Sequence, residues 1–379
     1  LAAGKMHFYP WEAGFGFRER IIAEDKLWGF IEDDYAAFLA EAGYCKRDFV
    51  RVAEYHQHHM ACTSPHPWEY SVDHYVGHET ARWIRDYDKD APFAIMVGFP
   101  GPHSPYDPAA EYAGIDPTAM PEPLPGNYAD TGLMNQGRPS GPESGRSWYA
   151  VDNPTPPSWE TYMIQRARYA GLVEQIDLEV GRIVEALEEK GILDETVILF
   201  SSDHGDHLGD HGLSGKGSFY EASCHVPMIA CHPQVGAAVA DDLVTLTDVT
   251  ATLLGLAGRP LPSYMEARPL PGLNLPGEGR TQVCGSLRAG WMLFDGTWKL
   301  VKYPGGAHLF NLEEDPAEQH NRIADADDAR AGSRLDAALT SMVMEAAAAS
   351  FQTGRHGATS SAVDYGRRGW KRPYPMPWK

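Results

Sequence analysis

An apolar run that ends at an acid–histidine pair is the most constraining feature of this 379-residue chain (residues 197–217, VILFSSDHGDHLGDHGLSGKG). A short, continuous apolar run is typical of a buried parallel strand. In open α/β sheets, ligands bind beyond the carboxyl ends of such strands. We therefore expect Asp203 and His204 to lie side by side where an α/β enzyme does its chemistry, as metal ligands with the cation of Lys216 nearby. This arrangement points to hydrolysis of a charged ester.

Hydrophobic periodicity along the rest of the chain predicts an α/β fold. Apolar residues at helical spacing predict helices over residues 71–87, 162–190, 248–258 and 330–350, and short apolar runs predict strands over 92–99 and 226–233. Short alternating runs with glycine turns predict an antiparallel meander over residues 280–312. Residues 117–157 are dense in Pro, Gly, Ser and Asn, and loops of that length are usually functional.

Composition excludes two classes of partner. The formal net charge of −20 argues against a general nucleic-acid binder, because phosphate backbones are bound by an excess of Lys and Arg. No run approaches 18 apolar residues, so we expect no membrane partner. The five cysteines are scattered and have no CxxC spacing, which indicates free thiols rather than a disulfide framework or a zinc site.

Four short motifs follow one another along the chain. They are GKMHF at residues 4–8, GPHSPYDP at 101–108, SSDHGDHLGDHGLSGKGSFYEASCHVPMI at 201–229 and HLFNLEEDPAEQHN at 308–321. Together they resemble four elements of the type I sulfatases, in the alkaline phosphatase superfamily, in the same order. The resemblance covers most of the chain. It implies an alkaline-phosphatase-like α/β sandwich, with a mixed central sheet between helices and a small C-terminal antiparallel-sheet subdomain.

The resemblance also implies roles for four catalytic side chains. Lys216 would contact the sulfate oxygens, and Lys5 would lie near the nucleophile and the sulfate. His7 would assist the breakdown of a covalent intermediate. His103 would hydrogen-bond the leaving oxygen and protonate it as a general acid. The expected substrate is a small sulfated molecule, a sugar, aryl or alkyl sulfate.

The same resemblance makes Asp203 and His204 the ligands of one divalent metal. Carboxylate oxygens favour Ca²⁺ or Mg²⁺, and we expect Ca²⁺ first. Because a histidine ligand is unusual for Ca²⁺, Mn²⁺ and Zn²⁺ stay open. The neighbouring His207, Asp210 and His211 are expected behind the ligands or at the surface, with Asp210 and His211 as candidates for lining the pocket.

One family element does not occur in the sequence. The family carries a Cys-x-Pro-Ser-Arg or Ser-x-Pro-x-Arg motif whose first residue becomes formylglycine, whereas the segment CTSPH at residues 62–66 lacks both the spacing and the arginine. We therefore expect the nucleophile and two further carboxylate ligands on an N-terminal segment of about a hundred residues. The chain by itself is then expected to be inactive.

Two other functions stay open. A phosphonate monoester or phosphodiester hydrolase of the same superfamily would share the Ser-Asp-His-Gly sequence. Such phosphonate hydrolases tend to carry Tyr and Thr in the places of Lys5 and His7, and the two-zinc phosphodiesterases lack an element like that of Lys216, so the residues favour a sulfatase. A non-catalytic binding module or an inactive fragment is the third reading, supported by the absent nucleophile motif.

The chain is expected to divide into an α/β catalytic domain (1–265), an antiparallel subdomain with a helix (266–350) and a basic aromatic tail (351–379). The tail is expected to pack on the protein surface or on a neighbouring subunit of a homo-oligomer. We expect the substrate to be read by residues 117–157 and by side chains near His308. Aromatic rings that would stack on a substrate ring are Tyr128, Trp148, Tyr149 and Trp159.

Overall fold

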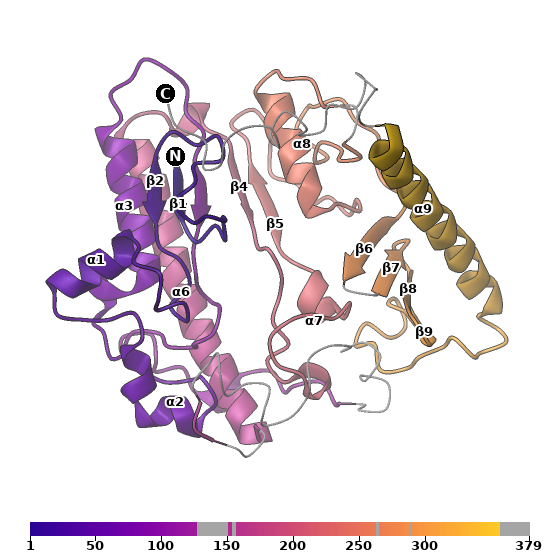
Figure 1. Ribbon diagram of the computed structural model, residues 1–379, viewed down its shortest axis with the longest axis horizontal. Coiled ribbons are helices and arrows are strands. Elements are labelled where there is room, and N and C mark those ends of the chain that lie inside the picture. The colour runs from indigo at the N-terminus through magenta and orange to yellow at the C-terminus, as the bar shows by residue number, and fades with distance from the viewer. Residues whose placement is uncertain (127–150, 154–156, 263–264, 288–289, 357–379) are drawn as a thin grey trace. The chain divides into compact units, whose positions relative to one another are not determined.

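A computed structural model describes residues 1–126, 151–153, 157–262, 265–287 and 290–356 of the chain (Figure 1). The described residues form two compact units. The first contains residues 1–123, 151–153 and 157–196, and the second contains residues 124–126 and everything described from residue 197 onward. The predicted domain boundary near residue 265 stays a prediction.

The first unit is built on a three-stranded parallel sheet in the order β2-β1-β3. Its strands are β1 (Ala2–Gly4), β2 (Arg20–Ile22) and β3 (Met96–Gly98). The strand predicted over residues 92–99 is thus confirmed over only three residues. A β-carbon on Gly4 would overlap the carbonyl group of Gly98, and Gly4 has a φ of 93°, so glycine is required where these two strands end.

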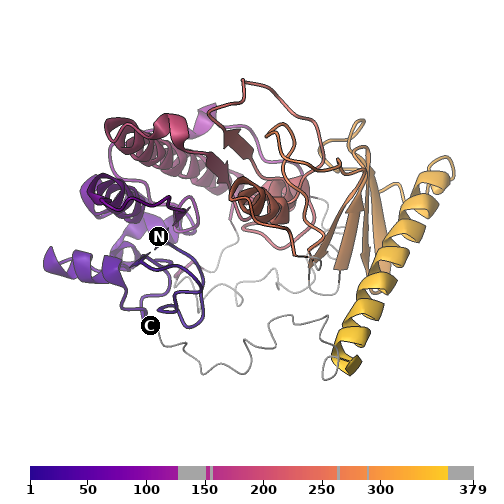
Figure 2. The same cartoon turned by 90° about the horizontal axis from the view of Figure 1, so that it is seen from above.

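The described residues of the first unit also contain four α-helices (Figures 1 and 2). They are α1 (Asp34–Glu41), α2 (Ala53–Gln57), α3 (Val72–Asp86) and α6 (Trp159–Glu189), with short 3₁₀ turns η1 (Asp48–Arg51), η2 (Trp68–Tyr70), η3 (Pro117–Ala119) and η4 (Leu193–Glu195). The helices predicted over residues 71–87 and 162–190 are confirmed. Ser71 and Ser158 begin α3 and α6 as N-caps, because each hydroxyl oxygen accepts a backbone N–H from the first turn.

The contact between α3 and α6 depends on a glycine and on a buried ion pair. The Nδ1 atom of His74 on α3 lies 2.9 Å from Oε1 of Glu179 on α6, and the Glu179 side chain is fully buried. A β-carbon on Gly77 would lie 2.6 Å from the β-carbon of Glu179. The two helices approach this closely because residue 77 has no side chain.

The second unit begins with β4 (Ile198–Ser201), which ends two residues before Asp203. Within the described part of the chain, β4 pairs only with β5 (Met228–Cys231), and the two strands are antiparallel. The prediction of a buried parallel strand is therefore wrong for this strand. The chain turns back through residues 202–227, which contain only the short η5 (Asp210–Gly212) and α7 (Glu221–Cys224), rather than through a crossover helix long enough for parallel pairing.

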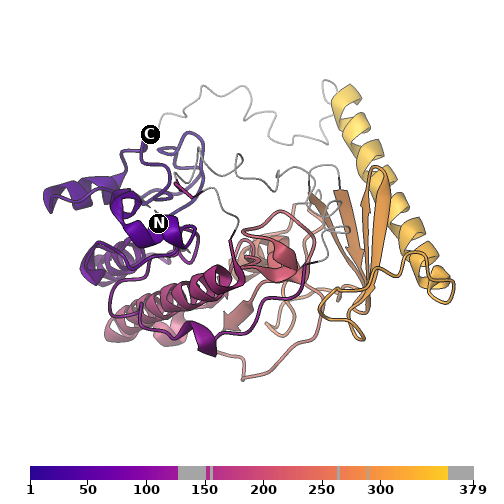
Figure 3. The same ribbon diagram turned by 90° about the horizontal axis from the view of Figure 1, so that it is seen from below.

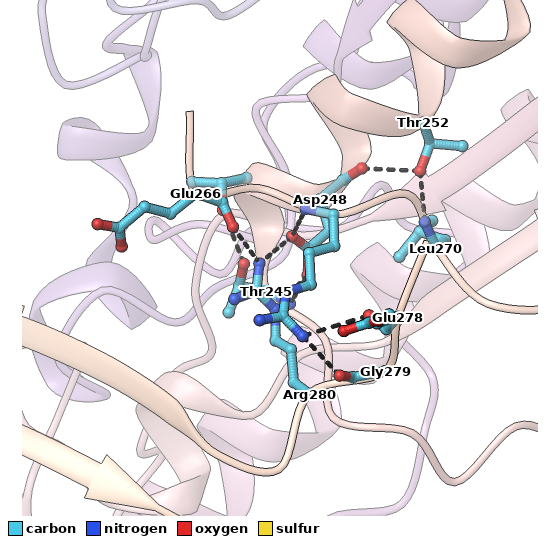
Figure 4. Close-up of polar contacts among 10 residues, drawn as sticks. Thr245, Asp248, Thr252, Glu266, Leu270, Glu278, Gly279 and Arg280 are labelled. Atoms are coloured by element: carbon cyan, nitrogen blue, oxygen red, sulfur yellow. Dashed lines mark hydrogen bonds and ion pairs between the residues drawn. The ribbon is translucent and has the colours of Figure 1, made fainter. Parts of the chain in front are cut away.

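A buried carboxylate anchors the proline-rich link that follows α8 (Leu246–Leu256), as Figure 4 shows. Thr245 and Asp248 form a capping box at the start of α8. The Asp248 carboxylate also accepts the backbone N–H of Arg268 at 2.8 Å and the Nε–H of Arg280 at 3.0 Å. The link is thus tied to α8 and leads directly into the next sheet.

A four-stranded antiparallel sheet with a helix on one face completes the second unit (Figure 3). The elements are β6 (Val283–Leu287), β7 (Gly290–Phe294), β8 (Trp298–Tyr303), β9 (Gly306–Asn311) and α9 (Ala329–His356). Leucines from β7, β8, β9 and α9 form the core between the helix and the sheet. This confirms the predicted meander and the predicted C-terminal helix, which continues six residues into the predicted tail.

The ammonium group of Lys299 on β8 ties this sheet to α7 through buried ion pairs. Its Nζ atom lies 2.5 Å from Oε1 of Glu221 and 2.8 Å from Oε1 of Glu318, and it donates to the carbonyl of Phe219 at 3.0 Å. The Lys299 side chain is 1% exposed, so the ammonium group replaces its hydration with these three acceptors. Glu318 also accepts the N–H of Glu221 at 2.7 Å.

The cysteines, the membrane-span prediction and the tail can each be compared with the described residues. The five cysteines are free, as predicted. None of the helices in the described ranges is both long enough and apolar enough to cross a membrane. Residues 357–379, which make up most of the predicted tail, lie outside the described residues.

The close approach at Gly77 predicts opposite effects for two glycine-to-alanine substitutions. Gly77→Ala places a β-carbon against Glu179 and should lower the free energy of unfolding by about 1–3 kcal/mol. Gly181→Ala on α6 meets nothing within 4 Å, so the better helix propensity of alanine should raise that free energy by about 0.5–1 kcal/mol. Urea unfolding of both variants measures the difference, and equal stabilities would contradict this description of the α3–α6 contact.

The Lys299 ion pairs predict a pH-dependent stability. Burial alone raises the pKa of Glu221, but hydrogen bonds from His225 and Lys299 and the Lys299 charge lower it to about 2. Glu221 therefore stabilises the fold fully above its ordinary pKa of 4.5, and this contribution is lost as the pH falls through about 2. Glu221→Gln should cost about 1–3 kcal/mol at pH 7 and clearly less at about pH 3.5.

The control for this experiment is Glu189→Gln. Glu189 pairs with Arg85 at 2.6 Å, but its side chain is 59% exposed, so the substitution should change stability by less than about 1 kcal/mol at either pH. Urea unfolding at the two pH values gives the comparison. A Glu221→Gln cost that does not change with pH would show that the carboxylate contributes through packing rather than through its charge.

Candidate functional site

Charged side chains that follow the three strands of the first unit meet at Asp25. Lys5 directly follows β1, Asp25 lies three residues after β2, and His103 lies in the loop after β3. The Nζ atom of Lys5 and the Nδ1 atom of His103 each lie 3.4 Å from the Oδ2 atom of Asp25. The side chains of Lys5, His103 and Asp25 are 10%, 17% and 8% exposed, so water screens their charges poorly. The structure thus brings together two of the predicted catalytic residues.

The Asp25 carboxylate is held in its charged form. Burial alone raises its pKa, but the charges of His103 and Lys5 and the backbone N–H of Leu27 outweigh burial, so the pKa of Asp25 is lowered. The Oδ1 atom of Asp25 accepts the N–H of Leu27 at 2.9 Å. Asp25 is therefore a fixed negative charge between a cation and an imidazole.

A hydrogen bond sets the orientation of the His103 ring. Nδ1 of His103 lies 2.7 Å from the carbonyl oxygen of Ser104. A carbonyl oxygen only accepts hydrogen bonds, so Nδ1 carries a hydrogen. The nitrogen that gains or loses a proton is therefore Nε2, as a general acid with a fixed ring requires.

His7 has other contacts. Its backbone N–H donates to the buried Glu24 carboxylate at 3.2 and 3.3 Å, and its φ of 50° is in the left-handed region. The imidazole ring stacks on Trp28 with ring centroids 4.8 Å apart. The backbone geometry of His7 is thus fixed by Glu24, while its predicted role in the breakdown of an intermediate stays a prediction.

In the second unit, Asp203 and His204 have the geometry of neighbouring metal ligands. Oδ2 of Asp203 and Nε2 of His204 are 3.4 Å apart. Nδ1 of His204 lies 2.8 Å from the carbonyl oxygen of Gly205 and so carries the ring hydrogen, which means that a metal would be bound through Nε2. The Asp203 side chain is 72% exposed, so the carboxylate is open to an ion.

These two residues fit a metal as part of a larger set of ligands. A carboxylate oxygen and an imidazole nitrogen at 90° to each other on one divalent ion are about 2.8–3.7 Å apart, a range that includes the 3.4 Å between the Asp203 and His204 atoms. Across the described residues, no group of three or more His, Cys, Asp or Glu side chains could hold a metal ion. The role of Asp203 and His204 as metal ligands, and which metal they would bind, therefore stays a prediction.

Lys216 lies in a half-buried loop between Gly215 and Gly217, whose φ values are 70° and 108°. The loop is held by the residues that follow the ligand pair. Oδ1 of Asp206 accepts the N–H of Gly215 at 3.0 Å. The N–H of His207 donates to the carbonyl oxygen of Gly215 at 2.8 Å. The backbone around Lys216 is thus tied to the ligand segment.

The three other polar residues of this segment contact the protein itself. His207 is buried, its Nε2 lies 2.9 Å from Oγ of Ser218, and burial lowers its pKa to about 4. His211 stacks on Tyr220 with ring centroids 3.8 Å apart, and Asp210 accepts the N–H of Leu124 at 2.8 Å. The expectation that these three residues lie behind the ligands or at the surface stays a prediction.

Two of the predicted substrate contacts belong to regular structure. Trp159 is the first residue of α6, because the helix begins after the Ser158 cap rather than at residue 162. The Trp159 side chain is 49% exposed. His308 lies in β9, is 1% exposed and stacks on Phe310, and the prediction that side chains near it read the substrate stays a prediction. Tyr128, Trp148 and Tyr149 lie outside the described residues.

Sequence reasoning missed Asp25 and Glu24. The signal was present, because the apolar residues 21–23 run directly into Glu24, Asp25 and Lys26, just as residues 197–200 run towards Asp203. The shortness of β2, only three residues, hid it. The same rule about the carboxyl ends of strands that selected Asp203 also selects these two acids.

A solved structure of another protein shows the fold of this chain. A phosphonate monoester hydrolase from Silicibacter pomeroyi has a similar structure, with a TM-score of 0.70 and 22% identity, over 86% of this chain and 71% of that chain. At this identity the likeness shows the fold alone. Together with the helices, the sheets and the C-terminal four-stranded sheet, it confirms the predicted alkaline-phosphatase-like α/β fold.

Sequence comparison identifies the family. The sulfatase family model matches residues 10–259, and an arylsulfatase of Clostridium perfringens is 30% identical over 84% of this chain and 70% of that protein. The chain belongs to the sulfatase family. Arylsulfatase K of Homo sapiens is 31% identical over 41% of this chain, and the match spans only 33% of that protein. Activity and substrate are therefore proposals for this chain.

The ligand geometry predicts that Asp203→Asn weakens metal binding in the complete enzyme. Removing one carboxylate charge from the ligand pair should lower the affinity for Ca²⁺ by more than about tenfold, with a parallel loss of activity. Isothermal titration of metal-free enzyme with Ca²⁺, and metal analysis after dialysis, measure this. Asp241→Asn, an exposed aspartate of the same unit, is the control. Unchanged metal content in Asp203→Asn would show that the ligands lie elsewhere.

Proposed function

We propose that this chain forms most of an enzyme that hydrolyses a sulfate monoester of a sugar, an aryl alcohol or an alkyl alcohol. The observation that carries the proposal is the meeting of Lys5 and His103 at Asp25. A sulfate ester requires positive charge for its anionic oxygens and an acid for its leaving oxygen. Membership in the sulfatase family supports sulfate as the ester.

Each of the two side chains has a separate task. The ammonium group of Lys5 stabilises negative charge on the sulfate oxygens. When the sulfur–oxygen bond breaks, the leaving oxygen takes the bonding electron pair and accepts the proton from Nε2 of the protonated His103. The Nδ1–H stays hydrogen-bonded to the Ser104 carbonyl, so the ring keeps its orientation while Nε2 loses the proton.

Asp203 and His204 would hold one divalent metal, with Ca²⁺ as the first expectation. Bound there, such a metal would supply positive charge to polarise the sulfate group. Lys216, on the loop that Asp206 and His207 hold, would contact sulfate oxygens, and His7 would assist the breakdown of a covalent intermediate. These roles follow from the family resemblance and from the positions of the four motifs.

The nucleophile is proposed to lie outside these 379 residues. The sequence has no Cys-x-Pro-Ser-Arg or Ser-x-Pro-x-Arg motif, and the described residues contain no group of three or more His, Cys, Asp or Glu side chains that could hold a metal. The chain by itself is then expected to bind the sulfate ester without turning it over.

A phosphonate monoester hydrolase is the second candidate function. Its support is the fold likeness to such an enzyme from Silicibacter pomeroyi. A cation beside an imidazole acid would serve a phosphonate ester equally well. Lys5 and His7 favour the sulfatase, and the ratio of kcat/KM for a nitrophenyl sulfate and a nitrophenyl phosphonate in the complete enzyme decides between the two.

The role of His103 predicts a dependence on the leaving group. An alkoxide needs a proton in the transition state far more than a stabilised phenolate does. In the complete enzyme, His103→Ala should therefore lower kcat/KM for an alkyl or sugar sulfate towards the upper end of about 10²- to 10⁴-fold, and distinctly less for nitrophenyl sulfate.

The control is His78→Ala, because His78 is an exposed histidine on α3 and should leave both rates unchanged. An equal loss for both substrates in His103→Ala would mean that His103 holds the sulfate group or the fold. Proton donation by His7 or by a water molecule would then replace it in the mechanism.

A further inference from the structure

Three buried side chains hold the loop that carries His103. Oδ1 of Asp73, in the first turn of α3, accepts the N–H of Gly101 at 2.8 Å. Asp25 contacts His103 itself, and Lys26 forms an ion pair with Asp107. The loop is thus held before, at and after the proposed general acid.

Asp25 and Lys26 are consecutive in sequence but make different contacts. The Asp25 carboxylate contacts Lys5 and His103, whereas the Lys26 ammonium contacts Asp107, whose side chain is 5% exposed. A buried charge without a partner is strongly destabilising, so both contacts must form when the chain folds. The two consecutive residues Asp25 and Lys26 therefore position both Lys5, which follows β1, and the loop of His103, which follows β3.

The same arrangement favours the catalytic form of the imidazole. An adjacent carboxylate stabilises imidazolium relative to neutral imidazole, and a general acid must start protonated. Because Nδ1 of His103 faces Asp25 and the Ser104 carbonyl, a proton given to the leaving oxygen would come from Nε2. Asp25 would do this from the Nδ1 side of the ring.

We propose that Asp25 is a positioning residue, which sets the spacing of Lys5 and His103 and keeps His103 protonated, while the Lys26–Asp107 pair fixes the loop. This proposal rests on the proposed function, because it assigns His103 as the acid of that reaction. It adds a residue outside the four motifs that identified the family, and it predicts a coupling between Lys5 and His103 through one carboxylate.

The first test measures His103 directly in the 379-residue chain. Histidine ring signals are followed by NMR against pH, with His103→Gln identifying the signal. Asp25→Asn keeps the shape of the side chain and removes its charge, so it should lower the pKa of His103. Asp116→Asn, an exposed aspartate that caps η3 in the same unit, should leave that pKa unchanged.

A second variant covers the case in which Asp25→Asn does not fold. Lys5→Gln removes the cation that shares the Asp25 carboxylate, so it should raise the pKa of His103. Opposite directions in the two variants support the coupling. An unchanged His103 titration in Lys5→Gln, or in a folded Asp25→Asn, would overturn it.

Kinetics in the complete enzyme separate positioning from a purely structural role. Asp25→Asn should lower kcat for an alkyl sulfate by about 10- to 100-fold, with a smaller loss for nitrophenyl sulfate and little change in KM. A loss that follows the fraction of folded protein and is equal for both substrates would overturn the proposal. A moving His103 titration in an enzyme that cleaves no sulfate ester would contradict the proposed function alone.

Discussion

The buried carboxylate of Asp25 is the interaction on which the site of the first unit depends. It is shielded from water, it is charged, and it contacts one cation and one imidazole through the same oxygen. In a poorly hydrated environment such contacts are strong, and an unmatched charge there is costly. The fold can therefore bury the charged Asp25 only if Lys5 and His103 are in place. The contacts that stabilise the fold here also set the geometry of the site.

The order of the parallel sheet explains why these distant segments meet. β1 is the central strand, and β2 and β3 pair with it on either side in parallel, so all three carboxyl ends lie at one edge. Gly4 and Gly98 allow β1 and β3 to end in close contact. The sheet itself is short and only its central strand is buried, and its contribution to function is to aim three loops at one point.

The second unit uses buried charge in the same way, but to join elements rather than to aim a site. Lys299 ties the C-terminal sheet to α7, which follows the loop of Lys216. Asp248 ties the proline-rich link to α8. In both cases an irregular segment is held by a charged side chain with several partners, because loops have too few apolar residues to be held by packing. The ligand segment from Asp203 onward is thus attached to rigid structure on its C-terminal side.

The sequence by itself determined the family, the long helices, the meander and most of the candidate residues. Helical periodicity and motif order are local properties, so α6 and the segment from Asp203 to Lys216 can be read without coordinates. Only the tertiary structure decided the partners. An apolar run carries no information on strand direction, so the antiparallel pairing of β4 could not be predicted from it. The burial of His308 depends on the residues that pack around β9, which are also not readable from the local sequence. Asp25 acquires its role only where three strand ends meet, because its contacts are with residues far away in the chain.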